Sequence, residues 1–150
     1  MGIVIGVLNV RRSGLIKAPP ARVWKEFVSF ETLSQWFGIG HTLHSFEPRV
    51  GGSIRLSVEI DGERAGYGGR VLVYEAEREL TFESQWDGAR AWPAPTLITI
   101  RLTPVYEGTL VEIFHHGFER FGAIAADELE GYESGWDTKH IKKLRAIIER

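Results

Sequence analysis

The 150-residue chain contains no cysteine. Disulfide frameworks, thiolate metal sites and cysteine nucleophiles are therefore excluded. No apolar run approaches the ~18 residues that a membrane-spanning helix needs. The first five residues are apolar, but they lack the basic region and the cleavage site of a secretory signal. We therefore expect a cytoplasmic protein without membrane insertion.

An excess of one charge is also absent, because 18 Lys and Arg stand against 20 Asp and Glu, for a net charge of −2. One dense basic run, Lys139, Lys142, Lys143 and Arg145, follows an acidic stretch near the C-terminus. This order complements a helix dipole, so we expect no nucleic-acid partner. Linkers, repeats and low-complexity tracts are missing as well, which predicts a single domain over residues 1–150.

The first third of the chain predicts a strand and two short helices. Residues 7–17 read as the strand, and Pro20 suits the first turn of the helix that follows. A second short helix carries Leu33, Trp36 and Phe37, and the glycines at 38 and 40 end it.

From there to residue 117 the hydrophobic period changes to two, which predicts antiparallel strands. The predicted strands fall within residues 53–60, 64–75, 80–86, 98–102 and 109–116. Asp61 and Gly62 supply the residues of a tight hairpin turn. In the last strand, Val111, Ile113 and His115 should form the inner face.

Helical spacing returns at the end of the chain and predicts one long helix over residues 123–149. Its apolar stripe contains Leu129, Tyr132, Trp136, His140, Leu144 and Ile147, with Glu133 inside it. Gly131 and Gly135 weaken the helix interior by about 1 kcal/mol each. Their spacing of four can let another backbone or a ligand approach closely.

Five sequence segments carry a family resemblance. They are residues 16–24 with Ala18, Pro19, Pro20, Val23 and Trp24; Trp36-Phe37; Val50-Gly51-Gly52; His115 with Gly117-Phe118; and Gly135-Trp136 with Leu144. In this order they resemble the START-like superfamily (SRPBCC, Bet v allergen, helix-grip), and within it the branch of the activator of the heat-shock-protein-90 ATPase. At position 132, where branch members often have a histidine, this chain has tyrosine, so no role of that histidine is carried over.

The resemblance implies an α+β helix-grip fold. Such a fold has a curved antiparallel seven-stranded sheet, two short helices after the first strand and a long C-terminal helix packed over an apolar cavity. Superfamily members bind lipids, sterols or polyketides, some cyclise or hydrolyse them, and some are co-chaperone domains. The fold therefore leaves the function open.

Several large side chains share the inward phase of different predicted elements. Each can line a cavity or can simply pack in the core. The candidates for ligand binding are Trp24, Phe27, Trp36, Leu56, Val58, Phe82, Trp86, Ile98, Ile100, His115, Tyr132, Trp136 and His140.

His115 and His140 are the polar members of this set. A buried ring nitrogen without a hydrogen-bond partner costs about 1–3 kcal/mol. Each histidine should therefore orient a polar ligand group, act as a general base, or be satisfied in the core by Tyr132, Glu133 or a backbone carbonyl. Arg12 shares strand phase with Val10 and Ile16, so it either enters the cavity, to pair with Glu133 or an anionic ligand, or stays exposed.

Metal and nucleophilic chemistry have weak sequence support. His41 and His44 offer two imidazoles three residues apart, but a third ligand would have to come from a distant element. The Gly-x-Ser-x-Gly elbow is absent, and Ser84 is the only serine on an inner strand face near possible bases. We expect no metal and no cofactor.

Three functions remain, besides a purely structural role. The leading hypothesis is a protein that binds a small apolar or aromatic ligand in the cavity, with His115 and His140 as polar contacts. The alternatives are a cyclase or hydrolase that uses the same histidines, and a co-chaperone-like module that binds a chaperone. A binder needs a connected cavity of ~300 Å³ or more.

Overall fold

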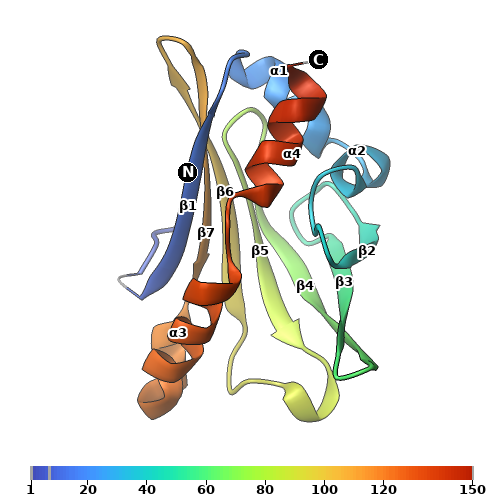
Figure 1. Ribbon diagram of the computed structural model, residues 1–150, viewed down its shortest axis with the longest axis vertical. Helices are drawn as coiled ribbons and strands as arrows, with labels where there is room; N and C mark the ends of the chain where they lie inside the picture. Colours follow the sequence, from blue (N-terminus) through green and yellow to red (C-terminus); the bar gives the residue numbers. More distant parts are fainter. Residues whose placement is uncertain (1, 7, 150) are drawn as a thin grey trace.

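A seven-stranded antiparallel sheet forms the framework of the protein (Figure 1). The computed structural model describes residues 2–6 and 8–149, and within these the side chains at 123, 126, 131 and 133–135 are outside the description. The strand order is β1-β7-β6-β5-β4-β3-β2, so β1 and β2 form the two edges. The strands are β1 (Asn9–Ile16), β2 (Thr42–Phe46), β3 (Ser53–Ile60), β4 (Glu63–Glu75), β5 (Glu79–Trp86), β6 (Thr96–Val105) and β7 (Gly108–His116).

The predicted strands and the hairpin are confirmed. Asp61 and Gly62 both have positive φ, 53° and 80°, as the β3–β4 turn requires. Val111, Ile113 and His115 are buried, as predicted for the inner face of β7. Period-two patterning had not singled out β2, because its five residues are too few to establish an alternation.

Glycine is required at one point in the middle of the sheet. Gly68 in β4 has a φ of 141°, and a Cβ atom there would lie 2.1 Å from the Ile54 carbonyl oxygen. A side chain at this position would push β3 and β4 apart.

The short helices after β1 are also confirmed. They are α1 (Pro20–Trp24), the 3-10 turn η1 (Lys25–Phe27) and α2 (Phe30–Ser34). The α2 helix starts at a capping box, in which Ser29 Oγ accepts from the Thr32 backbone N–H at 3.1 Å and Thr32 Oγ1 accepts from the Ser29 N–H at 3.2 Å.

The prediction of one long helix over residues 123–149 is wrong. The chain instead forms a 3-10 segment η3 (Phe118–Ile124), helix α3 (Ala125–Gly135) and helix α4 (Lys139–Ile148). Trp136 is extended, with φ −83° and ψ 140°. A new helix then starts where Asp137 Oδ1 accepts from the Lys139 backbone N–H at 2.8 Å.

The break between α3 and α4 has a fixed partner on the sheet. Arg12 of β1 donates from Nε and Nη2 to the Trp136 carbonyl oxygen, at 3.3 and 3.1 Å. Arg12 is therefore directed inward, toward the break. Its predicted pairing with Glu133 lies outside the described side chains.

The two helices cover different parts of the sheet (Figure 1). Ile141 and Leu144 of α4 are buried in the main core together with α1, α2 and the sheet. The η3–α3 segment builds a smaller cluster from Phe118, Phe121 and Ala125. Among the described residues, no helix is long and apolar enough to cross a membrane.

Candidate functional site

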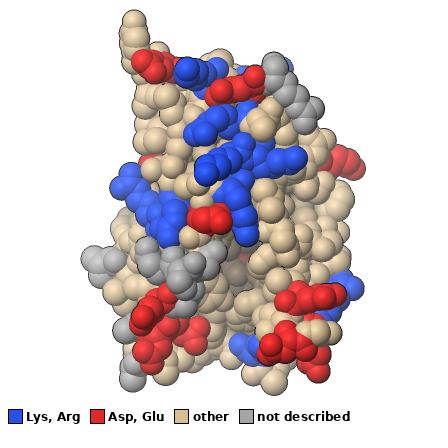
Figure 2. Space-filling model, in the orientation of Figure 1, with Lys and Arg blue, Asp and Glu red and all other residues tan. Residues whose placement is uncertain are grey.

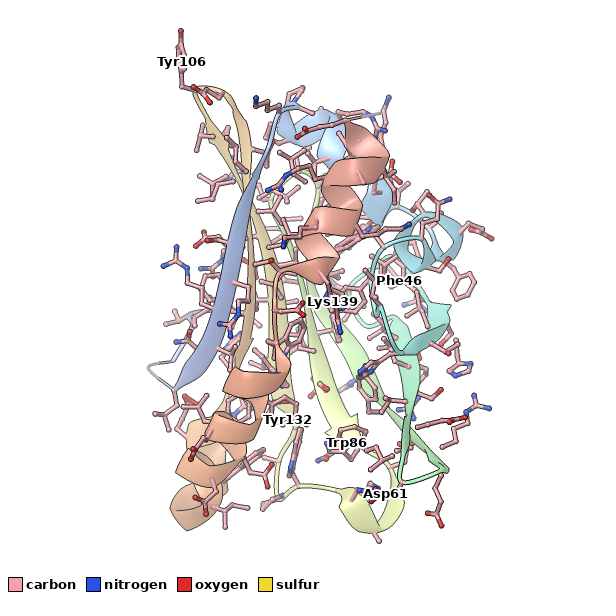
Figure 3. All side chains as sticks on the ribbon, in the orientation of Figure 1. Phe46, Asp61, Trp86, Tyr106, Tyr132 and Lys139 are labelled. Atoms are coloured by element: carbon pink, nitrogen blue, oxygen red, sulfur yellow. The ribbon has the colours of Figure 1, made fainter. Side chains whose placement is uncertain are left out.

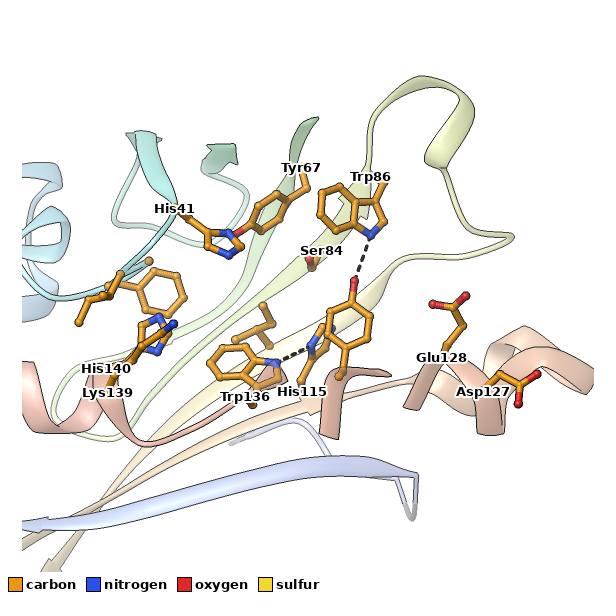
Figure 4. Close-up of a pocket in the computed structure, with 15 residues that line it drawn as sticks. His41, Tyr67, Ser84, Trp86, His115, Asp127, Glu128, Trp136, Lys139 and His140 are labelled. Carbon is orange, nitrogen blue, oxygen red and sulfur yellow. Dashed lines mark hydrogen bonds between the residues drawn. The ribbon is translucent and has the colours of Figure 1, made fainter. Parts of the chain in front are cut away.

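A pocket of about 360 Å³ opens where α3 gives way to α4 (Figure 4). The loop after α2, the strands β4 to β7, helix α3, the break and the start of α4 all contribute to its wall. The lining residues are Phe37, Gly38, Ile39, His41, Tyr67, Ser84, Trp86, Ile98, His115, Asp127, Glu128, Tyr132, Trp136, Lys139 and His140.

Two hydrogen bonds donated by tryptophan indoles hold the aromatic wall of the pocket together. Trp86 of β5 donates from Nε1 to the Tyr132 hydroxyl at 3.1 Å, which joins the sheet to α3. Trp136 donates from Nε1 to His115 Nδ1 at 3.1 Å, which joins the break to β7. Figure 3 shows Trp86 and Tyr132 facing each other across the lower half of the molecule.

His115 uses both of its ring nitrogens within the protein. Because the Trp136 indole N–H donates to Nδ1, the ring carries its proton on Nε2, which lies 2.8 Å from Thr96 Oγ1. The Thr96 hydroxyl donates in turn to the Ser84 carbonyl oxygen at 3.1 Å. Burial, with a smaller contribution from His116, lowers the pKa of His115 to about 3. A second proton would also have to face the indole N–H, so His115 stays neutral.

His115 is thus satisfied within the core, but Tyr132 is wrong as its partner, and Glu133 lies outside the described side chains. Tyr132 packs edge-on against the ring, with centroids 4.6 Å apart, and does not supply its hydrogen bond. Trp136 and Thr96 do so instead.

His140 differs from His115 in the hydrogen bonding of its ring. Its side chain is 7% exposed, yet Nδ1 has no hydrogen-bond partner within the described part of the protein. The ring lies between Phe37 and Trp136, with centroids 5.6 and 5.3 Å away. Burial, with a smaller contribution from the Lys139 charge, lowers the pKa of His140 to about 4. A neutral imidazole thus lines the pocket, and one of its buried nitrogens has no partner in the described part of the protein.

His41 and Lys139 lie at the same end of the pocket as His140 (Figure 4). His41 Nδ1 is 2.5 Å from the Tyr67 hydroxyl. Burial lowers the pKa of His41, and the Lys139 charge lowers it further. Burial raises the pKa of Tyr67, so this phenol remains protonated.

The structure brings six of the thirteen predicted residues to the pocket wall: Trp86, Ile98, His115, Tyr132, Trp136 and His140. It places the other seven elsewhere. Of these, Val58 is half-buried, and the rest are packed in the main core: Trp24, Phe27, Trp36, Leu56, Phe82 and Ile100. The ligand-binding role of the six stays a prediction.

Sequence reasoning missed much of the polar lining. Asp127 and Glu128 belong to the acidic stretch and Lys139 to the basic run of the predicted helix, and none of the three was a candidate for the site, although all three line the pocket. Tyr67 precedes the glycines of β4, which was the one signal that could have drawn attention to it. His41 was considered only as a metal ligand.

His41 and His44 do not form a site together. His41 lines the pocket, whereas His44 Nε2 contacts Ser57 Oγ at 2.7 Å and the Arg64 guanidinium at 2.6 Å. Within residues 2–6 and 8–149, no group of three or more His, Asp or Glu side chains is arranged to hold a metal ion.

The sequence match decides the family. Residues 17–149 match the activator of Hsp90 ATPase homolog 1-like proteins. The chain belongs to this family. No curated protein matches the sequence.

Solved SRPBCC-type structures share the fold of this family member. A protein from Arthrobacter aurescens, solved by NMR in solution, matches with a TM-score of 0.71 and 22% identity, over 95% of this chain and 86% of that one. A crystal structure from Chromobacterium violaceum matches with a TM-score of 0.68 and 22% identity, over 95% and 98%. The crystal structure of DynU16, a putative protein in the dynemicin biosynthetic locus, matches with a TM-score of 0.65 and 23% identity. The match covers 96% of this chain and 48% of DynU16. At these identities the likeness concerns the fold alone.

Proposed function

We propose that this family member binds one small apolar or aromatic molecule in the pocket between the sheet and the α3–α4 break. The observation that carries the proposal is the free Nδ1 of His140, buried in the wall of a cavity of about 360 Å³. A buried polar atom without a partner costs about 1–3 kcal/mol. A ligand that supplies the missing hydrogen bond recovers this free energy.

The surroundings of His140 favour a flat, apolar ligand. Phe37, Trp86, Tyr132 and Trp136 all line the pocket. Aromatic faces and edges stack on rings of a ligand, and a few polar atoms then fix its orientation.

Binding has more support than catalysis. The cyclase or hydrolase alternative uses His115 and His140 as bases, and both nitrogens of His115 are already bonded. His140 has a free nitrogen, but a pKa of about 4 makes it a weak base at neutral pH.

Support for a chaperone-docking role is weaker than for binding. In the described part of the chain, the exposed large apolar side chains are few and, apart from the adjacent Val105 and Tyr106, come from different segments: Val4, Val28, Val50, Val105, Tyr106 and Ile124. Protein-docking sites instead present one contiguous patch.

A titration with prodan, a neutral naphthalene dye whose emission reports an apolar environment, tests the proposal. We expect one dye per chain and a blue-shifted emission. The Ser84→Leu variant should abolish binding, because Ser84 lies buried in the floor of the pocket and leucine fills the space. The matched control is Ser45→Leu on edge strand β2, which lies outside the pocket and should bind normally. Absence of wild-type binding at about 1 mM dye would contradict the proposal.

A further inference from the structure

We infer that the ligand carries a carboxylate, and that the Lys139 end of the pocket holds this group. The inference rests on the proposed function and adds the chemical class of the ligand. It follows from an unequal distribution of hydrogen-bond donors and acceptors along the pocket.

Lys139 supplies the positive charge at this end. Its Nζ lies 3.9 Å from the point where a Cβ atom on Gly40 would stand, so the ammonium group reaches across the mouth from α4 to the loop after α2. Within the described residues, no carboxylate forms an ion pair with Lys139. The nearest acid in sequence, Asp137, uses Oδ1 to cap the Lys139 backbone N–H.

His41 and His140 supply neutral polar atoms beside this charge. When the Tyr67 hydroxyl donates to His41 Nδ1, the His41 proton sits on Nε2 and is available to an acceptor. His140 Nδ1 is buried and unpartnered in the same wall. An ammonium group and two imidazoles therefore converge on one end of an otherwise aromatic cavity.

The opposite end of the pocket is acidic. Asp127 and Glu128, from the first turn of α3, line it there, and Figure 4 shows them far from His41 and Lys139. Figure 2 shows the same polarity on the surface, with Lys and Arg gathered toward α4, Asp and Glu gathered at the lower end of the view, both over α3 and at the lower right, and a hollow between. A ligand with one negative group is therefore bound in one orientation.

The small positive charge of the pocket lining favours a ligand with a carboxylate over one with a phosphate. Arginine is absent from the described pocket lining, and Lys139 is its only permanent cation. Both imidazoles stay neutral because burial and the lysine charge lower the pKa of each. One full positive charge matches a monoanion, whereas a phosphate dianion would remain half-compensated in an apolar site.

A matched pair of ligands tests this inference, namely 2-naphthoate and its neutral methyl ester at pH 7.5. We expect the wild type to bind naphthoate about tenfold more tightly than the ester, since a charge-assisted hydrogen bond at a partly exposed site is worth roughly this factor. Lys139→Gln should weaken the binding of naphthoate about fivefold or more and should change the affinity for the ester by less than about twofold. The control, Lys142→Gln, removes an exposed charge of α4 outside the pocket and should change both by less than about twofold.

The outcomes separate the two proposals. Equal affinities for acid and ester, unaffected by Lys139→Gln, would overturn the carboxylate site and leave the ligand-binding function intact. Equal losses in the Lys139 and Lys142 variants would also overturn it, because they would report general surface charge. If neither compound nor prodan binds, the proposed function itself fails. A naphthoate advantage that disappears only in Lys139→Gln supports the site.

Discussion

The interior of the protein has two regions that use the same kinds of side chain in different ways. Under α4, Phe27 and Trp36 are completely buried and pack with ring centroids 5.1 Å apart. Under the α3–α4 break, Trp86, Tyr132 and Trp136 are only half-buried and surround an opening. The first region is a filled core and the second is a pocket.

The difference lies in what covers the sheet. Above the core, α4 is continuous, and Ile141 and Leu144 fill the space beneath it. Above the pocket, the extended Trp136 interrupts the helix, and its carbonyl oxygen is held by Arg12. A missing helical turn, rather than a change in composition, creates the cavity.

Truncating one indole in each region should give the largest contrast. Trp36→Ala removes a fully buried ring and the hydrogen bond from Nε1 to the Glu26 carbonyl, and it should cost about 3–5 kcal/mol. Trp136→Ala removes a half-buried ring together with the donor to His115 Nδ1, and it should cost about 2–3 kcal/mol. Urea unfolding measures both, and equal losses would mean that the pocket is packed as tightly as the core.

Acid should destabilise the protein partly through His140. Its folded pKa of about 4 lies below the unfolded value of 6.5, so the unfolded chain takes up the proton first. Stability is therefore lost as pH falls from about 6.5 to about 4, by up to about 1.4 kcal/mol per pH unit from this group. His140→Leu should remove that part of the slope and cost little at pH 7.5, since it also removes an unpartnered nitrogen. An unchanged slope in urea melts at pH 6.5 and 5.0 would refute this role.

The two indole hydrogen bonds of the pocket should differ in their contribution to the stability of the protein. Trp136→Phe leaves the buried Nδ1 of His115 without a donor and should cost about 1–2 kcal/mol. It should also raise the pKa of His115, because a proton on Nδ1 no longer meets an N–H group. Trp86→Phe leaves the Tyr132 hydroxyl at the pocket surface, where water replaces the donor, and should cost less than about 1 kcal/mol. Thermal melts and histidine NMR titration check this order, and a reversed order would contradict it.

Arg12 should have a small effect on global stability and a local effect on the break. Arg12→Met should cost about 1 kcal/mol and speed hydrogen exchange at the start of α4, because the Trp136 carbonyl loses this donor. The matched variant Arg11→Met removes the ion pair between the exposed Arg11 and the partly buried Glu112, and it should leave that exchange unchanged. Equal exchange rates in both variants would show that Arg12 does not fix the break.

The alternation of apolar and polar residues, together with the turn residues, sufficed to predict most of the sheet. Most strands repeat this alternation over several residues. Sequence patterns failed at the helix break, since Leu129, Tyr132, Trp136, His140 and Leu144 keep one helical stripe across it. The helical spacing of apolar residues cannot reveal an extended residue when the residues on both sides of it continue the same spacing. Gly135 at the end of α3 and Asp137 before α4 were the available signals.

The site was predictable only in part for the same reason. Inward phase selects core and pocket residues alike, so Trp36 and Trp86 looked equivalent in the sequence. Whether a ring packs or lines a space depends on what covers it. His140 was identified because a histidine on an apolar stripe is chemically conspicuous, whereas Lys139 was taken for an exposed charge of the helix.

The indole N–H signals in a ¹⁵N NMR spectrum provide the most direct test of the central claim, that the pocket and not the core receives the ligand. Each tryptophan gives one signal, which single Trp→Phe variants assign. On addition of prodan, the signals of Trp86 and Trp136 should shift with saturation at one ligand per chain, while those of Trp24 and Trp36 should stay in place. Shifts of Trp24 and Trp36, or no shift of any indole, would contradict the account.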